Sequence, residues 1–295
     1  MWFTLSIEEA KTYEYDIIVV GTGIGGGIVS GQLFDTNSQL GKNAKSILVI
    51  EKGGLVFHTH CLNTSRPSGL GEDRGQQNDT FFAKFKSDYN LVGNTNIQDV
   101  KAGPLYNLGG RSVVWGLFVP RIHDKTLERD FPRPVRQGLL WKYYREAENL
   151  MNLSLPTTRT IHQDLMERLN MGSDPKVQWQ WGRIASEFSD FRNFDFAQGA
   201  YSTVDKLLEI AMSKPKIGGV ETEHKNFKML LRTEVRKLTW NGSKLKGVVA
   251  RGPDGEETEF TIRNGGKVVL CAGSVDSAAI LLRSGKKDFL KKRWK

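Results

Sequence analysis

The sequence has few cysteines and no long apolar run, and both absences exclude classes of protein. Its 295 residues include only Cys61 and Cys271, and two distant cysteines define neither a disulfide framework nor a zinc site. No stretch reaches the ~18 apolar residues of a membrane-spanning helix. Glu8, Glu9 and Lys11 interrupt any signal-peptide core. Since the carboxyl end is not a peroxisomal tripeptide either, we expect a cytoplasmic protein with no membrane span.

A surplus of positive charge is concentrated at the carboxyl end. The net charge is +9, and residues 286–295 hold six basic residues and one acidic residue, so this basic tail carries +5. No basic stripe with interleaved aromatic residues recurs elsewhere, and nucleic-acid binding is therefore not expected. Apolar residues make up 39% and charged residues 25%, which excludes wholesale disorder.

Histidine is also scarce, and its placement does not suggest a metal site. His58 and His60 stand close to Cys61, but no further cluster of ligand residues accompanies them, and zinc needs three or four protein ligands. We therefore expect a loop with surface histidines at this position and no metal.

A glycine-rich segment lies between two short apolar runs near the N-terminus. Tyr15–Val20 and Ser46–Glu51 are apolar without alternation, as expected for parallel strands covered on both faces. Five of the seven residues at 21–27 are glycine. They include a G-x-G-x-x-G motif that follows a strand and opens a helix at about 25–34. The motif consists of Gly21, Thr22, Gly23, Ile24, Gly25 and Gly26.

This order of strand, glycines, helix and strand predicts a dinucleotide site. Gly21 permits the tight turn, Gly23 lets the backbone approach a pyrophosphate, and Gly26 lets the helix pack closely on the strand. The phosphates would meet the positive end of the helix. Glu51 ends the second strand, where its carboxylate can accept hydrogen bonds from a ribose diol and would repel the 2′-phosphate of NADP. These features do not separate FAD from NAD.

The remaining sequence indicates loops, then helices, then strands. We expect residues 1–13 to be a polar leader and 53–103 to be loops with one short helix near 81–85. Helices are expected at 138–150, 160–171 and 202–212, the last with Ser202 as N-cap. Strands are expected at 227–238, 245–251, 257–263 and 267–271. A last helix, which Ser274 can cap, runs to about 284.

Four segments together resemble the glucose–methanol–choline (GMC) oxidoreductases, a family of FAD-dependent alcohol oxidases and dehydrogenases. The first is YDIIVVGTGIGGGIVSGQL with IEKG, and the second is NLGGRSVVWG at 107–116. The third is RTEVRKL at 232–238, and the fourth is VVLCAGSVDSAAILLRSG at 268–285. The resemblance spans about 15–120 and 228–285 and favours FAD as the cofactor.

The resemblance implies further cofactor contacts. The second segment is similar to the family's flavin-contacting loop, which implies roles for Gly109, Gly110, Ser112 and Trp115. The third is similar to the strand whose backbone meets the adenine, here at Val235. Trp115 favours the pyranose oxidase branch of the family. The fourth segment looks like the family's second signature and supplies Ala272 and Gly273. Taken singly, a buried loop, an ordinary hairpin and a helix N-cap explain these three segments as well.

Two departures from the family shape the functional expectation. Val114 stands where the pyranose oxidase branch carries a histidine that can bond to the flavin, so the FAD is expected to be non-covalent. Family members are about twice this length, and their catalytic histidine lies in the half that has no counterpart here. None of the five histidines matches a family motif, and the catalytic residues are therefore unknown.

We expect an FAD-dependent oxidoreductase that acts on the CH–OH group of a small-molecule alcohol or sugar, with hydride transfer to flavin N5. The alternative is a truncated, catalytically inactive flavin- or nucleotide-binding remnant of such an enzyme. An NAD-dependent dehydrogenase and an electrostatic binder that uses the basic tail are less favoured by the motifs.

The expected fold is α/β, with a doubly wound, Rossmann-like parallel sheet. The FAD-binding domain is expected to be discontinuous, at 14–135 and 226–285. A mainly helical, partial substrate domain is inserted between them at 136–225, and the basic tail follows at 286–295. The pattern does not indicate an oligomeric state.

Overall fold

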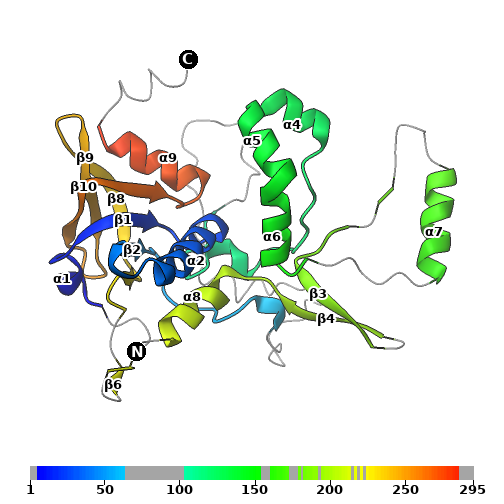
Figure 1. The fold of residues 1–295 in the computed structure, drawn as a ribbon, viewed down its shortest axis with the longest axis horizontal. Coiled ribbons are helices and arrows are strands. Elements are labelled where there is room, and N and C mark those ends of the chain that lie inside the picture. Colours follow the sequence, from blue (N-terminus) through cyan, green and yellow to red (C-terminus); the bar gives the residue numbers. More distant parts are fainter. Residues whose placement is uncertain are drawn as a thin grey trace. The chain divides into compact units, whose positions relative to one another are not determined.

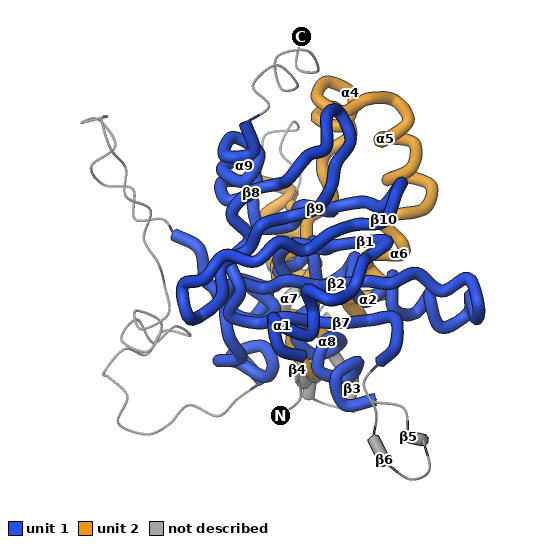
Figure 2. Tube along the Cα trace, turned by 90° about the vertical axis from the view of Figure 1, so that its left-hand side faces the viewer, with its two compact units in different colours: residues 1–114, 202–295 blue, residues 115–201 orange. Residues whose placement is uncertain are grey.

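The computed structural model describes most of the chain, in two compact units. The described ranges are 5–63, 103–153, 160–172, 179–180, 182–191, 194–213, 216–217, 220–221 and 224–285. The first unit consists of residues 1–114 and 202–295 and the second of residues 115–201, coloured blue and orange in Figure 2. The basic tail and the short helix expected near 81–85 lie outside the described residues.

A six-stranded mixed sheet lies at the centre of the first unit (Figure 1). Its strand order is β7-β2-β1-β10-β9-β8. The strands are β1 (Glu14–Val20), β2 (Ile47–Ile50), β7 (Phe227–Leu230), β8 (Glu234–Asn241), β9 (Lys244–Arg251) and β10 (Glu257–Leu270). β7, β2, β1 and the end of β10 run parallel, whereas β8, β9 and the start of β10 are antiparallel. The expected α/β fold with a mostly parallel sheet is confirmed.

Both faces of the parallel strands are buried, as their unbroken apolar sequences predicted. Ile18 and Val20 of β1 belong to one core cluster, whereas Val19 belongs to the other. On β2, Leu48 and Val49 likewise point to opposite clusters. This alternation follows from the period of two in a strand.

Helices cover the two faces. α2 (Ile24–Gln39) and α8 (Thr203–Met212) pack on one face, and α9 (Ser274–Arg283) packs on the other. Figure 1 shows α2 and α9 on opposite sides of β1. Leu207 of α8 is fully buried in one cluster, and Ile280 of α9 is almost fully buried in the other. The predicted N-cap of α8 is confirmed, because the Ser202 hydroxyl accepts from the Val204 amide.

Two strand boundaries differ from the prediction. The stretch expected as one strand at 227–238 divides into β7 and β8, because the chain turns at Arg232, which has φ +54°. Conversely, the two strands expected at 257–263 and 267–271 form one strand, β10. The register of β10 against β1 shifts after Ile262, and Gly265 with φ +81° lies in this irregular part.

The N-terminal residues are part of the core and not only a polar leader. Ser6 and Glu9 form a capping box that starts the short helix α1 (Ile7–Ala10). Ala10 is fully buried, and its carbonyl accepts a 2.8 Å hydrogen bond from the Tyr15 hydroxyl. The expectation of a polar leader at 1–13 therefore did not include the packing of Ala10 into the core.

The second unit combines helices with a two-stranded ladder. Its helices are α4 (Asp124–Asp130), α5 (Arg133–Gly138), η5 (Leu139–Tyr143), α6 (Tyr144–Leu150) and α7 (Thr160–Met171). β3 (Ser186–Phe191) and β4 (Phe194–Ala200) pair antiparallel. The sequence analysis did not predict this pair, although alternating aromatic and polar residues are typical of strands. No helix among the described residues is long and apolar enough to cross a membrane.

The remaining elements of the first unit are short. They are the helical turns η1 (Gly41–Asn43), η2 (Cys61–Asn63) and η4 (Gly110–Val113) and the strand pair β5 (Lys216–Ile217) and β6 (Val220–Glu221). The compact units do not coincide with the expected domains. Residues 115–135 belong to the second unit and α8 to the first, because α8 packs against α2. The assignment of functional domains stays a prediction.

Candidate functional site

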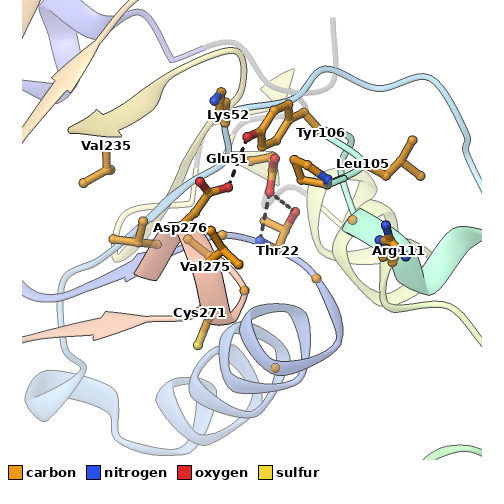
Figure 3. Close-up of a pocket in the computed structure, with 18 of the residues that line it drawn as sticks. Thr22, Glu51, Lys52, Leu105, Tyr106, Arg111, Val235, Cys271, Val275 and Asp276 are labelled. Carbon is orange, nitrogen blue, oxygen red and sulfur yellow. Dashed lines mark hydrogen bonds between the residues drawn. The ribbon is translucent and has the colours of Figure 1, made fainter. Parts of the chain in front are cut away.

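A cavity of about 470 Å³ lies at the carboxyl ends of the parallel strands. In the sheet, β1 lies between β2 and β10, so the strands that follow β1 in the chain are placed on both sides of it. Ligands of open α/β sheets bind at such a point, where the strand order reverses. The ends of β1, β2 and β10, the start of β8, the N-terminus of α9 and parts of 103–112 line the cavity (Figure 3). All of these residues belong to the first unit.

Gly21 and Gly26 are required by contacts within the protein. Gly21 has φ +90°, and a Cβ on it would lie 2.6 Å from the carbonyl oxygen of Cys271. A Cβ on Gly26 would lie 1.8 Å from the carbonyl oxygen of Gly21. The first glycine therefore serves the tight turn, and the second allows α2 to begin against the end of β1.

Gly23 and Gly273 face open space instead. Apart from chain neighbours, no atom of the described residues lies within 4 Å of where a Cβ would stand on either glycine. Gly23 is the N-cap of α2 and Gly273 the N-cap of α9, and neither helix has a side-chain cap. Ser274, which was expected to cap α9, is its first helical residue. The first amides of both helices thus remain available, and phosphate is a ligand that such amides favour.

Glu51 is buried at the end of β2, with 5% of its surface exposed. Its Oε2 accepts from the amide and the hydroxyl of Thr22 at 2.9 and 2.6 Å (Figure 3). Its Oε1 accepts from the amide of Gly53 at 2.7 Å. Burial raises the pKa of this carboxyl, and the hydrogen bonds and the charge of Lys52 oppose the rise. Because a carboxylate has about four acceptor positions, Glu51 can still accept a ligand hydroxyl.

Charged and aromatic side chains border the cavity beside Glu51. The Lys52 ammonium lies 3.0 Å from the Glu234 carboxylate and 3.8 Å from the centre of the Tyr106 ring. The Tyr106 hydroxyl donates to Asp276 at 3.1 Å (Figure 3). Burial lowers the pKa of Lys52, whereas its hydrogen bonds to Tyr106 and Glu234 and the charges of these groups raise it. The net result is a raised pKa. None of these residues was predicted from the sequence, because they come from separate segments and form no local motif.

Two glycine loops border the cavity, and the second, residues 109–112, lies against the first, residues 21–26. Gly109 and Gly110 have φ +85° and +50°, a region that side chains disfavour. A Cβ on Gly110 would lie 3.0 Å from Cα of Gly23. Ser112 lines the cavity, but its buried hydroxyl lies 2.9 Å from Oγ1 of Thr203 and thus faces α8.

The other predicted cofactor contacts fall into two groups. Those that line the cavity are Thr22, Ile24, Gly25, Val235, Ala272 and Gly273. Trp115 is not among the residues that line it; it belongs to the second unit, and its Nε1 donates to the Tyr201 carbonyl at 2.9 Å. Val114 is partly buried against the core cluster on the α8 side of the sheet.

Two further glycines of α2 serve helix packing, which the sequence analysis did not recognise. A Cβ on Gly27 would lie 2.4 Å from Cβ of Thr203, and one on Gly31 would lie 3.2 Å from Cγ of Lys206. Their spacing of four residues puts both on the same face of α2. The glycine-rich stretch therefore reflects contact with α8 as well as the cavity.

Among the described residues, the histidines and cysteines belong to no cluster of metal ligands. His58 is exposed, but His60 is fully buried, and its Nδ1 accepts from the Leu62 amide at 3.1 Å. The expectation of surface histidines is thus wrong for His60. Within the described ranges, no group of three His, Cys, Asp or Glu side chains could hold a metal ion. Cys271 is half-buried and lines the cavity, and burial raises the pKa of its thiol.

A known protein family matches a segment that supplies strands beside the cavity. Residues 219–288 match the GMC oxidoreductase family model. This range contains two of the four motifs on which the resemblance rested, at 232–238 and 268–285, so the resemblance is confirmed there. No curated protein matches the sequence.

Solved structures extend the likeness to most of the chain. A formate oxidase variant from Aspergillus oryzae RIB40, studied for its FAD modification, has a TM-score of 0.57 at 15% identity over 93% of this chain and 48% of its own. Pyridoxine 4-oxidase from Mesorbium loti has a TM-score of 0.56 at 16% identity over 92% of this chain and 52% of its own. The chain therefore shares the fold of the parts of these structures that it covers, and it spans about half of their length.

Proposed function

We propose that this chain binds FAD non-covalently in the cavity and forms the FAD-binding part of an oxidoreductase acting on the CH–OH group of a small alcohol or sugar. The observation that carries the proposal is that the open Gly23, which begins the uncapped α2, and the buried Glu51 carboxylate line the same cavity. One cavity thus offers acceptors for a ribose and donors for a pyrophosphate.

The residues that line the cavity fit FAD. Glu51 would hold the adenosine ribose, the amides that follow Gly23 and Gly273 would hold the pyrophosphate, and Val235 would border the adenine. When bound, FAD supplies the hydride acceptor, and the chain binds and orients it. The family match at 219–288 supports FAD over NAD. The apolar Val114 supports non-covalent binding, since it has no nucleophilic atom.

The choice of an alcohol or sugar substrate rests on the resemblance to the GMC family. The choice of the pyranose oxidase branch rests on Trp115. A general base near the reacting hydroxyl is part of this chemistry. None of the four histidines whose side chains the structure describes, at 58, 60, 123 and 224, is among the residues that line the cavity. This observation favours a second candidate function, in which the chain binds FAD or another adenine dinucleotide without oxidising an alcohol.

Both candidates are tested on the purified chain. Titration with FAD, NAD and NADP followed by calorimetry should show binding of FAD and weak or no binding of NADP. Acid precipitation should release the flavin into the supernatant, and flavin that stays with the pellet would contradict non-covalent binding. Anaerobic bleaching of bound flavin by a panel of sugars and alcohols would support the oxidoreductase. Binding without bleaching would favour the second candidate. No FAD binding would refute the first candidate, and no binding of any of the three dinucleotides would refute both.

A further inference from the structure

Thr22 belongs to the first glycine loop and is completely buried, and each of its polar groups makes a hydrogen bond within the protein. Its hydroxyl donates to Glu51 Oε2 at 2.6 Å and accepts from the amide of Gly109 at 3.0 Å. Its carbonyl accepts from Oγ1 of Thr203 at 3.0 Å. One small side chain therefore joins the end of β2, the second glycine loop and, through its backbone, the start of α8.

These contacts connect segments that are distant in sequence. Thr22 is separated by 29 residues from Glu51, by 87 from Gly109 and by 181 from Thr203. Near the same point, the buried Ser112 hydroxyl accepts from the Thr203 amide at 3.1 Å and donates to the Gly109 carbonyl at 2.6 Å. Because buried polar networks hold a defined geometry only when every member is satisfied, the loops depend on Thr22 for their relative position.

We infer that Thr22 is a positioning residue for the cofactor site: its hydroxyl sets the Glu51 carboxylate and the second glycine loop in their binding arrangement. This inference rests on the proposed function for its cofactor part. It differs from the expectation that Thr22 itself contacts the cofactor, since the hydroxyl already donates one hydrogen bond and accepts another inside the protein.

Two substitutions separate the hydroxyl from the shape of the side chain. Thr22→Val keeps the shape and removes the hydroxyl, so the Gly109 amide loses its acceptor and Glu51 loses one of three donors. Thr22→Ser keeps the hydroxyl and removes only a methyl group. Ser30→Ala is the matched control. It also removes a buried hydroxyl from the same region, but no hydrogen-bond partner for Ser30 is found among the described residues.

The first measurement uses the cofactor-free chain. Amide hydrogen exchange of Gly109 should become at least about tenfold faster in Thr22→Val, because an amide without its acceptor loses protection. It should stay near the wild-type rate in Thr22→Ser and Ser30→Ala. The amide of Gly27, which donates to the Gly23 carbonyl at 2.7 Å, serves as an internal reference. Equal Gly109 exchange in all four proteins would overturn the inference.

The second measurement is the dissociation constant for FAD. Thr22→Val should bind about tenfold more weakly, and Thr22→Ser should recover most of the affinity. Faster Gly109 exchange with unchanged FAD affinity would show that Thr22 positions nothing that the cofactor uses, and would also overturn the inference. If Thr22→Val does not fold, Thr22→Ala replaces it in both experiments. A wild-type chain that binds no FAD would refute the proposed function, while Gly109 exchange would still decide whether Thr22 joins the loops.

Discussion

The first glycine loop (residues 21–26) and the second (residues 109–112) border one cavity, but their glycines meet different surroundings. In the first loop, Gly26 is closed in by protein atoms, whereas Gly23 faces open space. In the second loop, Gly109 and Gly110 both have positive φ and protein atoms at 3.0 Å. The comparison shows that a glycine motif alone does not explain why side chains are absent. The structure shows whether the space beside each glycine holds protein atoms or is open to a ligand.

The largest effect is expected at the glycine that the protein encloses most tightly. Gly26→Ala would place Cβ 1.8 Å from the Gly21 carbonyl oxygen, and α2 would have to move away from β1. We expect the free energy of unfolding to fall by about 3 kcal/mol or more, measured by urea denaturation. Gly25→Ala is the control, because the nearest atom to its Cβ is Cys271 Sγ at 3.9 Å. Equal stability of the two variants would remove the distinction between enclosed and open glycines.

Gly23 is expected to show the opposite behaviour. Gly23→Val fills space that holds no described protein atom and that a pyrophosphate would occupy. We expect the affinity for FAD to fall by at least about 100-fold, or ~2.7 kcal/mol, with little change in the unfolding midpoint. Calorimetry and thermal unfolding of the same preparation measure both quantities. Wild-type FAD affinity in this variant would refute the placement of the pyrophosphate.

Glu51 lies at the ribose end of the same site. Glu51→Ala removes the charged hydrogen-bond acceptor, and we expect a loss of about 1.5–3 kcal/mol in FAD binding with the fold retained. The dissociation constant is compared with that of wild type, and circular dichroism checks the fold. An unchanged constant would mean that Glu51 is not the ribose ligand.

The second loop should respond more mildly than Gly23. Gly110→Ala puts a side chain at φ +50° and 3.0 Å from Cα of Gly23. The left-handed conformation costs about 1–2 kcal/mol, so stability should fall by this amount, and FAD affinity should fall with it because the loops are displaced together. A variant that loses stability but keeps its FAD affinity would separate the two loops functionally.

The smallest effect concerns pH. Burial raises the pKa of Glu51 above its ordinary value, so the folded chain takes up this proton at a higher pH than the unfolded chain. As pH falls through the raised pKa, protonation of Glu51 should increase the stability of the cofactor-free chain relative to Glu51→Gln. FAD affinity should decrease over the same range, because a protonated carboxyl is a poorer ribose acceptor. Parallel pH profiles for wild type and Glu51→Gln would contradict this role.

Much of the fold and of the candidate site was predictable because it depends on short segments. The apolar runs of β1 and β2 are separated by the glycine motif, and Glu51 ends the second run, so the order of the sequence placed them correctly at one sheet edge. The motifs at 232–238 and 268–285 lie within the matched family segment. The β3–β4 pair was not predictable in the same way, because its strands are short and their alternation of apolar and polar residues covers only a few positions. The turn at Arg232 was not predictable because arginine is uncommon at positive φ.

The sequence by itself determined the strand, glycine turn and helix near the N-terminus, since conformational preference and burial pattern act over a few neighbouring residues. Only the tertiary structure decided that Cys271 encloses Gly21 and that α8 encloses Gly27, because these contacts depend on how β10 and α8 pack beside the loop and α2. It also decided that Tyr106 meets Asp276, 170 residues further along, and that Thr22 joins Glu51 to Gly109. Such contacts leave no periodic pattern in the sequence, because they arise only when distant segments pack at the same edge of one sheet.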